Sequence, residues 1–112
     1  MSNEAPEVFL RWERFVGWLF DHTSKFPRAV RMSVTLRIEN LALDVFEALV
    51  EARYDVDRSL ALRRAGIGVE KLRLLLRLAC NRRYLPPASL EYAVVELDLV
   101  GRQVGGWQKS SR

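Results

Sequence analysis

Arginine and lysine side chains are concentrated in two separate stretches of the sequence. Residues 24–38 contain four basic residues and no acidic one, and residues 58–83 contain eight basic residues against Glu70 alone. Between them, residues 39–57 carry six acidic residues against Arg53. Guanidinium and ammonium groups bind phosphate through charge-assisted hydrogen bonds, and each neutralised phosphate of a nucleic acid releases counterions. This spacing predicts a dipolar molecule that can contact a polyanion.

The residues needed for other kinds of chemistry are few. His22 is the only histidine and Cys80 the only cysteine, so the sequence offers no Cys–His zinc site and no intramolecular disulfide. A carboxylate metal site in a helical bundle needs Glu-x-x-His pairs, which are absent. Three acidic residues share one predicted helix face, namely Asp44, Glu47 and Glu51. We expect this face to be solvated or paired with Arg63 and Arg64, and we expect no enzymatic activity, no metal and no cofactor.

Apolar residues recur at spacings of three and four along almost the whole chain, which is typical of amphipathic helices. Phe26–Pro27 and Pro86–Pro87 interrupt the pattern, because proline suits a first helical turn and disfavours helix in the residue before it. The stretch 54–57 interrupts it a third time. The pattern predicts four helices, at about residues 7–23, 27–54, 58–83 and 87–105, and a flexible tail at 107–112. Gly66 and Gly68 predict a weak or bent point in the third helix, or its division into two pieces.

The four predicted helices have short connections and one core-forming apolar stripe each, which includes Trp12 in the first helix, Leu49 in the second, Leu72 in the third and Leu97 in the fourth. They predict an all-α, up-down-up-down four-helix bundle in a single domain, residues 1–112. Antiparallel neighbours bring the start of the second helix and the end of the third to the same end of the bundle. We expect nucleic acid or a partner protein to bind there through Lys25, Arg28, Arg31, Arg73, Arg77, Arg82 and Arg83. A solvated arginine-rich surface is the alternative, and Arg37 could form a structural ion pair instead.

Arg28 and Arg31 lie where they do not favour the stability of the predicted second helix. The helix dipole favours acidic side chains in the first turn and basic ones in the last. Arg82 and Arg83, at the predicted end of the third helix, agree with this rule, whereas Arg28 and Arg31 oppose it. We therefore expect Arg28 and Arg31 to serve a partner outside the helix.

Several apolar residues fall outside the core stripes of three predicted helices. They form either the margin of a wide core or the interface of a homo-oligomer. We expect an interface, formed by Leu10, Trp18, Leu74, Leu78, Tyr92, Val95 and Leu99. No apolar run reaches the length of a membrane span, and the first residues are acidic rather than signal-like. We therefore expect a cytoplasmic protein without a membrane partner.

Four segments of the sequence resemble the accessory variability determinant proteins of diversity-generating retroelements. They are RWERFVGWLFDHTSKFPRAVR, LRIENLALDVFEALVEARY, LRRAGIGVEKLRLLLRLA and LEYAVVELDLVGRQVGGWQKS, and the resemblance spans about residues 8–109. That family lies within a broader group of four-helix-bundle proteins that includes the ribosomal RNA intervening-sequence proteins. The resemblance is specific at four points: Phe26–Pro27 with Arg31, the segment 37–42, Glu70-x-Leu72-Arg73 with the segment 76–79, and Gly101–Arg102 with the later Gly-Gly-Trp.

The resemblance implies a ring-like homo-oligomer, a homopentamer of four-helix bundles with a basic surface. It also implies an accessory factor that binds the retroelement reverse transcriptase and RNA or DNA, and that supports mutagenic cDNA synthesis and retrohoming without being the polymerase. The sequence departs from the family pattern at Gly66, Gly68 and Pro86, none of which is a basic position. An oligomeric scaffold of the intervening-sequence type is the alternative, and a neighbouring reverse transcriptase gene would favour the accessory factor.

Overall fold

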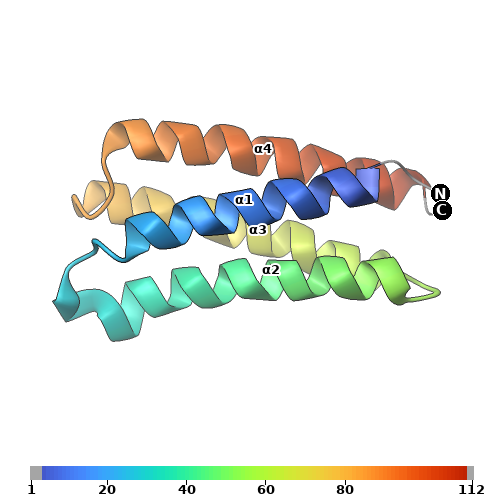
Figure 1. Cartoon of the computed structure of the whole chain (residues 1–112), viewed down its shortest axis with the longest axis horizontal. Helices are drawn as coiled ribbons and strands as arrows, with labels where there is room; N and C mark the ends of the chain where they lie inside the picture. The colour runs from blue at the N-terminus through green and yellow to red at the C-terminus, as the bar shows by residue number, and fades with distance from the viewer. Residues whose placement is uncertain (1–3, 111–112) are drawn as a thin grey trace.

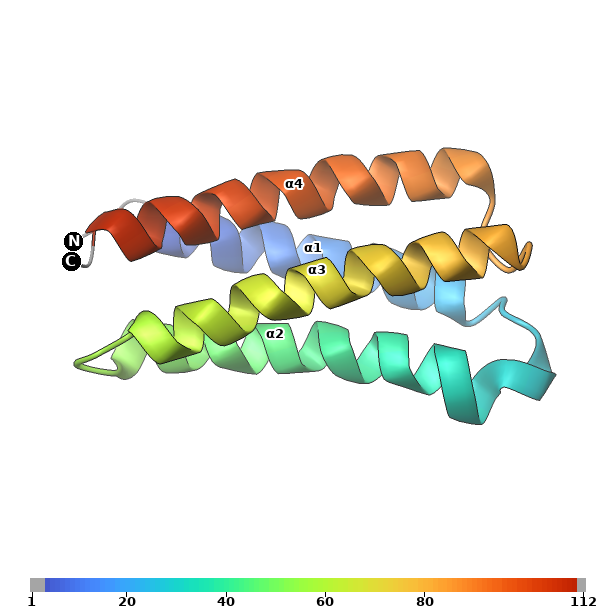
Figure 2. The ribbon, with the colours of Figure 1, turned by 180° about the vertical axis from the view of Figure 1, so that it is seen from behind.

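The structure is a computed structural model that describes residues 4–110, and it is a bundle of four long helices (Figure 1). The helices are α1 (Glu4–Thr23), α2 (Leu36–Tyr54), α3 (Ser59–Asn81) and α4 (Pro87–Ser110), and α2 is preceded by a 3₁₀-helix, η1 (Arg28–Val30), and a π-helix, η2 (Arg31–Thr35). The described residues contain no strand. Successive helices run in opposite directions (Figures 1 and 2). The predicted all-α, up-down-up-down bundle is confirmed.

A single hydrophobic core lies between the four helices. α1 and α3 each pack against both α2 and α4, so the helices occupy the corners of a square. The predicted stripes supply most of the core, and Trp12, Leu49, Leu72 and Leu97 contribute one fully buried side chain from each helix. The buried indole of Trp12 donates a hydrogen bond to the carbonyl oxygen of Ala42 at 2.9 Å, which satisfies its one polar atom.

The chain between α1 and α2 differs from the predicted continuous helix over residues 27–54. Three residues after Pro27 form a 3₁₀-helix, the next five form a π-helix, and regular α-helix begins only with α2. Pro27 is extended (φ −56°, ψ 140°), and its carbonyl oxygen accepts the amide hydrogen of Val30 at 3.1 Å. The wider π turn takes up an additional residue, and Phe26 before this segment and Ile38 after it are both buried. The predicted start of the second α-helix is therefore wrong.

α3 runs without interruption through both glycines (Figure 2). Gly68 is buried against α2, and a Cβ atom there would lie 2.4 Å from Cγ2 of Val45, whereas a Cβ atom at Gly66 would meet nothing within 4 Å. Residue 68 is thus a point of close approach between two helices. The close packing of α2 and α3 offsets the roughly 1 kcal/mol that glycine costs in a helix. Because α3 is continuous, the predicted alternative of a third helix in two pieces is wrong.

α4 extends beyond its predicted end at residue 105. Both glycines at 105–106 stay helical, and the helix reaches residue 110. The predicted flexible tail is therefore wrong for residues 107–110. Residues 111–112 of that tail lie outside the described residues. The cause is Trp107, which is 1% exposed. Its ring lies edge-on to that of Phe9, with centroids 6.4 Å apart, and the guanidinium of Arg58 lies 5.6 Å from its centre. Burial of this indole outweighs the cost of about 1 kcal/mol for each glycine.

Candidate nucleic-acid interface

The connection between α1 and α2 and the connection between α3 and α4 lie at the same end of the bundle (Figures 1 and 2). They contact each other through Phe26 and Tyr84, whose ring centroids are 5.9 Å apart. Phe26 and Leu85 are buried, so both connections are anchored in the core. η1 and η2 therefore lie close to the C-terminal end of α3, and the two basic stretches of the sequence meet.

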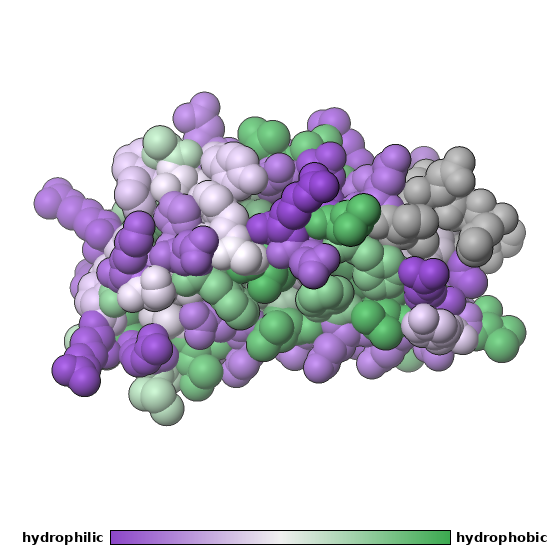
Figure 3. Space-filling model, in the orientation of Figure 1, coloured by the Kyte–Doolittle hydropathy of each residue, from purple (hydrophilic) through white to green (hydrophobic). Residues whose placement is uncertain are grey.

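Six of the seven predicted binding residues belong to this part of the molecule, which we call the basic end: Lys25, Arg28, Arg31, Arg77, Arg82 and Arg83. All six are exposed, and none of them forms an ion pair with another residue of the range 4–110. Asp21 and Glu91 are the acidic residues on the adjoining turns of α1 and α4, so positive charge prevails. Hydrophilic side chains project from this end of the molecule (Figure 3, left).

Arg73, the seventh predicted residue, is held differently. Its guanidinium pairs with Asp98 of α4 at 2.6 Å and with Glu70 of α3 at 3.3 Å. Burial alone would lower the pKa of Arg73, but its hydrogen bonds to Asp98 and Glu70 reverse this effect, and the pKa lies above its ordinary value. The charge of Arg73 joins α3 to α4, and we leave this residue out of the basic end.

The C-terminal cap of α3 holds Arg83 in an unusual backbone conformation. α3 ends at Asn81, two residues before its predicted end, and Arg83 has a φ of 65°, in the left-handed region that favours glycine. The amide of Arg83 donates to the carbonyl oxygen of Cys80 at 2.9 Å, and that of Tyr84 donates to Ala79 at 2.8 Å. These bonds form a Schellman motif. A left-handed backbone costs a residue with a side chain about 1–2 kcal/mol, so a guanidinium is present here at the expense of stability.

Two aromatic residues that organise the basic end were not identified as part of the site from the sequence. Phe26 and Tyr84 join the two connections, and a side-chain hydrogen bond with Tyr84 holds the pKa of Arg82 above its ordinary value. Their position is the signal that could have identified them, since each lies one or two residues before a proline at the start of a helical segment. In both connections an aromatic ring anchors a basic loop to the core.

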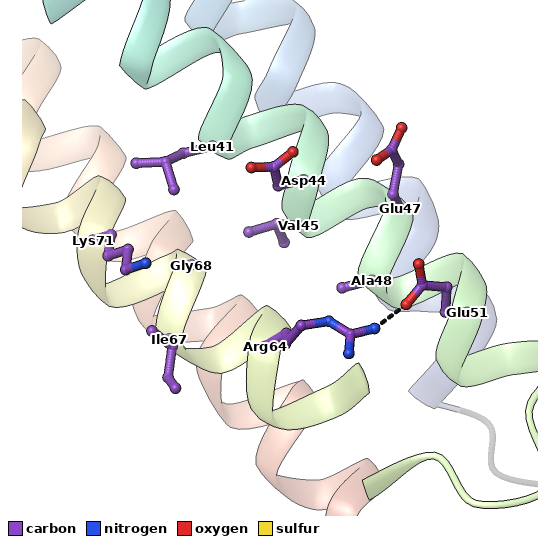
Figure 4. A pocket seen from close by; sticks show the side chains of 10 residues that line it. All are labelled: Leu41, Asp44, Val45, Glu47, Ala48, Glu51, Arg64, Ile67, Gly68 and Lys71. Carbon is purple, nitrogen blue, oxygen red and sulfur yellow. Dashed lines mark hydrogen bonds and ion pairs between the residues drawn. The ribbon is translucent and has the colours of Figure 1, made fainter. Parts of the chain in front are cut away.

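The other polar residues considered from the sequence, Glu51 and His22 among them, interact with neighbouring residues of the bundle. Among residues 4–110, no group of three or more His, Cys, Asp or Glu side chains is placed to hold a metal ion. Glu51 forms an ion pair with Arg64 of α3 (Figure 4). Pairing of the acidic face with Arg64 was one of the two alternatives expected from the sequence. Arg63, the other arginine named there, is exposed. His22 is half-buried against Trp18, and its Nδ1 donates a hydrogen bond to the Trp18 carbonyl oxygen at 2.9 Å, because that oxygen can only accept.

The apolar residues predicted to form a subunit interface lie on the surface of the single chain. Five of them are exposed, namely Leu10, Leu74, Leu78, Tyr92 and Val95, and two are half-buried, namely Trp18 and Leu99. They are therefore available for contact with another molecule.

Comparison with known proteins gives one family. The model of the family described as bAvd-like matches residues 8–111, a range that contains every residue of the basic end. No curated protein matches the chain. Within residues 4–110, none of the helices combines the length and the apolar character that a membrane crossing requires.

Proposed function

Because the chain belongs to the bAvd-like family of accessory variability determinant proteins, we propose that it is an accessory factor of a diversity-generating retroelement that binds template RNA or DNA through its basic end. Membership itself supports an accessory role in such retroelements, in a family whose proteins are not catalysts. The proposal adds the binding surface, the nucleic-acid partner and the retroelement reverse transcriptase as a second partner, all in the cytoplasm.

The observation that carries the proposal is the set of six exposed cations at the basic end without ion-pair partners in the described chain. Several unpaired like charges at one end of the molecule raise the positive potential there, so this end attracts an anion. A phosphate backbone supplies such charges at regular spacing, and the contact requires no reading of base sequence. The left-handed conformation of Arg83 supports the same conclusion, because residues in costly backbone conformations cluster at functional sites.

The assembly that we propose is a homopentamer. Exposed apolar residues on three helices support association of subunits, and five copies would present the basic end five times. Linked sites bind a long polyanion more tightly than one site does, through effective concentration alone. The factor would thereby hold template RNA beside the reverse transcriptase during mutagenic cDNA synthesis and support retrohoming.

The test compares two double variants that remove the same charge from different places. Arg28→Ala with Arg31→Ala removes two cations from the basic end. Arg63→Ala with Lys109→Ala removes two exposed cations from other parts of the chain. We expect the first variant to bind labelled template RNA about tenfold more weakly, equivalent to about 1.4 kcal/mol, with an unchanged melting temperature. We expect the second to bind as the unmodified protein does.

Equal losses in both double variants would show that only net charge matters, and a lower melting temperature in the first would show a structural role for its arginines. Either result would contradict the proposed site. Co-purification with the reverse transcriptase of the retroelement tests the second partner, and its absence would contradict the accessory role proposed here.

A further inference from the structure

The connection between α3 and α4 forms a pocket at the basic end. The pocket has a volume of about 500 Å³ and is lined by seven consecutive or nearly consecutive residues: Cys80, Asn81, Arg83, Tyr84, Leu85, Pro86 and Pro87. Pockets that bind small organic ligands usually have volumes of about 300–1,000 Å³. This pocket is therefore large enough to receive a single nucleotide.

The backbone around the pocket is held in place on both sides. On the α3 side, the hydrogen bonds of the Schellman motif fix residues 79–84. On the α4 side, the carbonyl oxygen of Pro86 accepts the amide hydrogens of Ser89 and Leu90 at 3.0 and 3.1 Å. The rings of Pro86 and Pro87 also fix φ at both positions. The walls of the pocket are therefore rigid, and a ligand binds there at little cost in conformational entropy.

The lining combines positive charge with flat apolar surface. Arg83 is exposed and forms no ion pair within residues 4–110, and no acidic residue of that range lines the pocket. The ring of Tyr84 is half-buried and is positioned by its contact with Phe26, at 5.9 Å between centroids. Pro86 and Pro87 add further apolar surface. A ligand that joins a planar ring to an anionic group fits these walls, and a nucleotide is such a ligand.

The lining also offers a hydrogen-bonding group without a partner in the described chain. The side-chain amide of Asn81 is exposed and forms no hydrogen bond with another residue of the range 4–110. An amide side chain both donates and accepts, so it can pair with the edge of a base. Asn81 therefore supplies what the apolar walls lack, a polar contact that orients a ring.

We propose that this pocket binds one unpaired nucleotide of the strand that the basic end holds. The base packs against Tyr84 and the two prolines, Asn81 bonds to its edge, and Arg83 pairs with the adjoining phosphate. The base must be unpaired, because the bases of a duplex are stacked inside it and do not reach a pocket. The inference rests on the proposed function and deepens it: the bound strand is single, and base contacts hold it in addition to charge.

The pocket also gives a reason for the costly backbone conformation of Arg83, which has a φ of 65°. Glycine is the usual residue of such a cap and would adopt this conformation without strain. Glycine at residue 83 would remove the guanidinium from the lining, and no other cation of the described chain lines the pocket. Arginine is thus present where the phosphate of a bound nucleotide needs a partner.

Cys80 provides a direct readout of whether the pocket is occupied. It is the only cysteine of the sequence, it is half-buried, and it lines the pocket. Iodoacetamide alkylates the thiol, and mass spectrometry of the intact protein measures the rate. An occupied pocket excludes the reagent, so the rate follows the unbound fraction of the protein. It should fall about tenfold when the ligand concentration is about ten times its Kd.

Three ligands of equal length are compared, each at the same multiple of its own Kd: a single-stranded RNA, an abasic chain with the same phosphates, and an RNA duplex. We expect the single-stranded RNA to slow alkylation of Cys80 about tenfold. The abasic chain and the duplex should bind but leave the rate nearly unchanged. Ser110→Cys in a Cys80→Ala background is the control, because residue 110 lies at the opposite end of α4 and is exposed. No ligand should slow its alkylation.

A matched pair of substitutions tests the contact with the base. Asn81→Ala should weaken the binding of single-stranded RNA about three- to tenfold, the effect of one hydrogen bond, and leave the affinity for the abasic chain unchanged. Asn40→Ala removes the same group from an exposed position of α2, outside the pocket. We expect it to change neither affinity.

Two results would overturn the pocket. Equal protection of Cys80 by the RNA and by the abasic chain would show a site for phosphate alone. Single-stranded RNA that binds without slowing alkylation would show that the strand lies elsewhere on the basic end. If none of the three ligands binds the protein, the result would instead contradict the proposed function on which the inference rests.

Discussion

The close approach of α2 and α3 at Gly68 gives the sharpest prediction about stability. Gly68→Ala would place a Cβ atom 2.4 Å from Cγ2 of Val45, whereas carbon atoms in contact are separated by about 3.5–4.0 Å. Val45 is buried and β-branched, so its side chain is nearly confined to one rotamer in a helix. The helices must separate or the valine must adopt a costly rotamer.

The expected size of the effect follows from two opposing contributions. Overpacking of this kind costs about 1–3 kcal/mol, and replacing glycine by alanine within a helix returns about 1 kcal/mol. We therefore expect Gly68→Ala to lower the free energy of unfolding by about 1 kcal/mol, or the melting temperature by about 4 °C. Gly66→Ala has open space around its new Cβ atom and should raise the free energy of unfolding by about 1 kcal/mol.

The assay is urea denaturation of the two alanine variants, followed by a double-mutant cycle with Val45→Ala. Removing the valine methyl groups leaves only the Cβ atom of residue 45, which would lie 3.8 Å from the new one. Gly68→Ala should therefore be stabilising in the Val45→Ala background, with a coupling energy of about 1–3 kcal/mol. Equal stability of Gly68→Ala and Gly66→Ala, or a coupling energy near zero, would refute the close approach.

Three further substitutions test other parts of the structure. Arg83→Gly relieves the left-handed arginine, so it should raise the free energy of unfolding by about 1 kcal/mol while weakening RNA binding; a less stable variant in thermal melting would contradict the described cap. Arg73→Ala should lower the free energy of unfolding by at most about 1 kcal/mol and leave RNA affinity unchanged, since the charge of Arg73 is already paired. Arg77→Ala should weaken RNA binding. Equal effects of the two variants in a filter-binding assay would show that the ion pairs of Arg73 do not affect RNA binding. Trp107→Ala should lower the free energy of unfolding in urea by about 3–5 kcal/mol, and an unaffected stability would mean that the end of α4 is not part of the core.

Apolar periodicity was sufficient to predict the four helices, because each stripe records which side of a helix is buried. Trp12, Leu49, Leu72 and Leu97 lie on the predicted stripes and are fully buried in the core. The order of the helices in space follows from their short connections, and with it the meeting of the two basic stretches at one end.

Features that depend on contacts between distant residues could not be predicted in this way. The irregular segment before α2 allows Phe26 to contact Tyr84, and α4 continues past two glycines because Trp107 contacts Phe9. The intrinsic helix propensities of nearby residues carry no information about Tyr84 or Phe9. The sequence therefore predicted a regular helix from residue 27 and an end of the last helix at residue 105. Gly68 shows the same effect, since its role is set by a valine on another helix.

The candidate site was predicted as a set of basic residues without knowledge of their partners. Arg73 and Arg77 are equivalent in sequence, one helical turn apart, yet only Arg73 faces Asp98 of α4. The left-handed Arg83 is likewise invisible in the sequence, because glycine, the usual residue of such a cap, is absent there. Charge can therefore be located from sequence, but whether a given charge is available to a partner depends on the fold.

Binding of single-stranded RNA at a series of salt concentrations tests the central claim most directly, with the unmodified protein and the Arg28→Ala, Arg31→Ala double variant compared side by side. Each phosphate contact on a single strand contributes about 0.7 to the slope of log affinity against log salt concentration. We predict a steep slope for the unmodified protein and a slope lower by about 1.4 for the variant, which has lost two contacts. An unmodified protein that binds no RNA at about 50 mM salt, or a variant with the same slope and affinity, would contradict the assignment of the basic end as the binding surface.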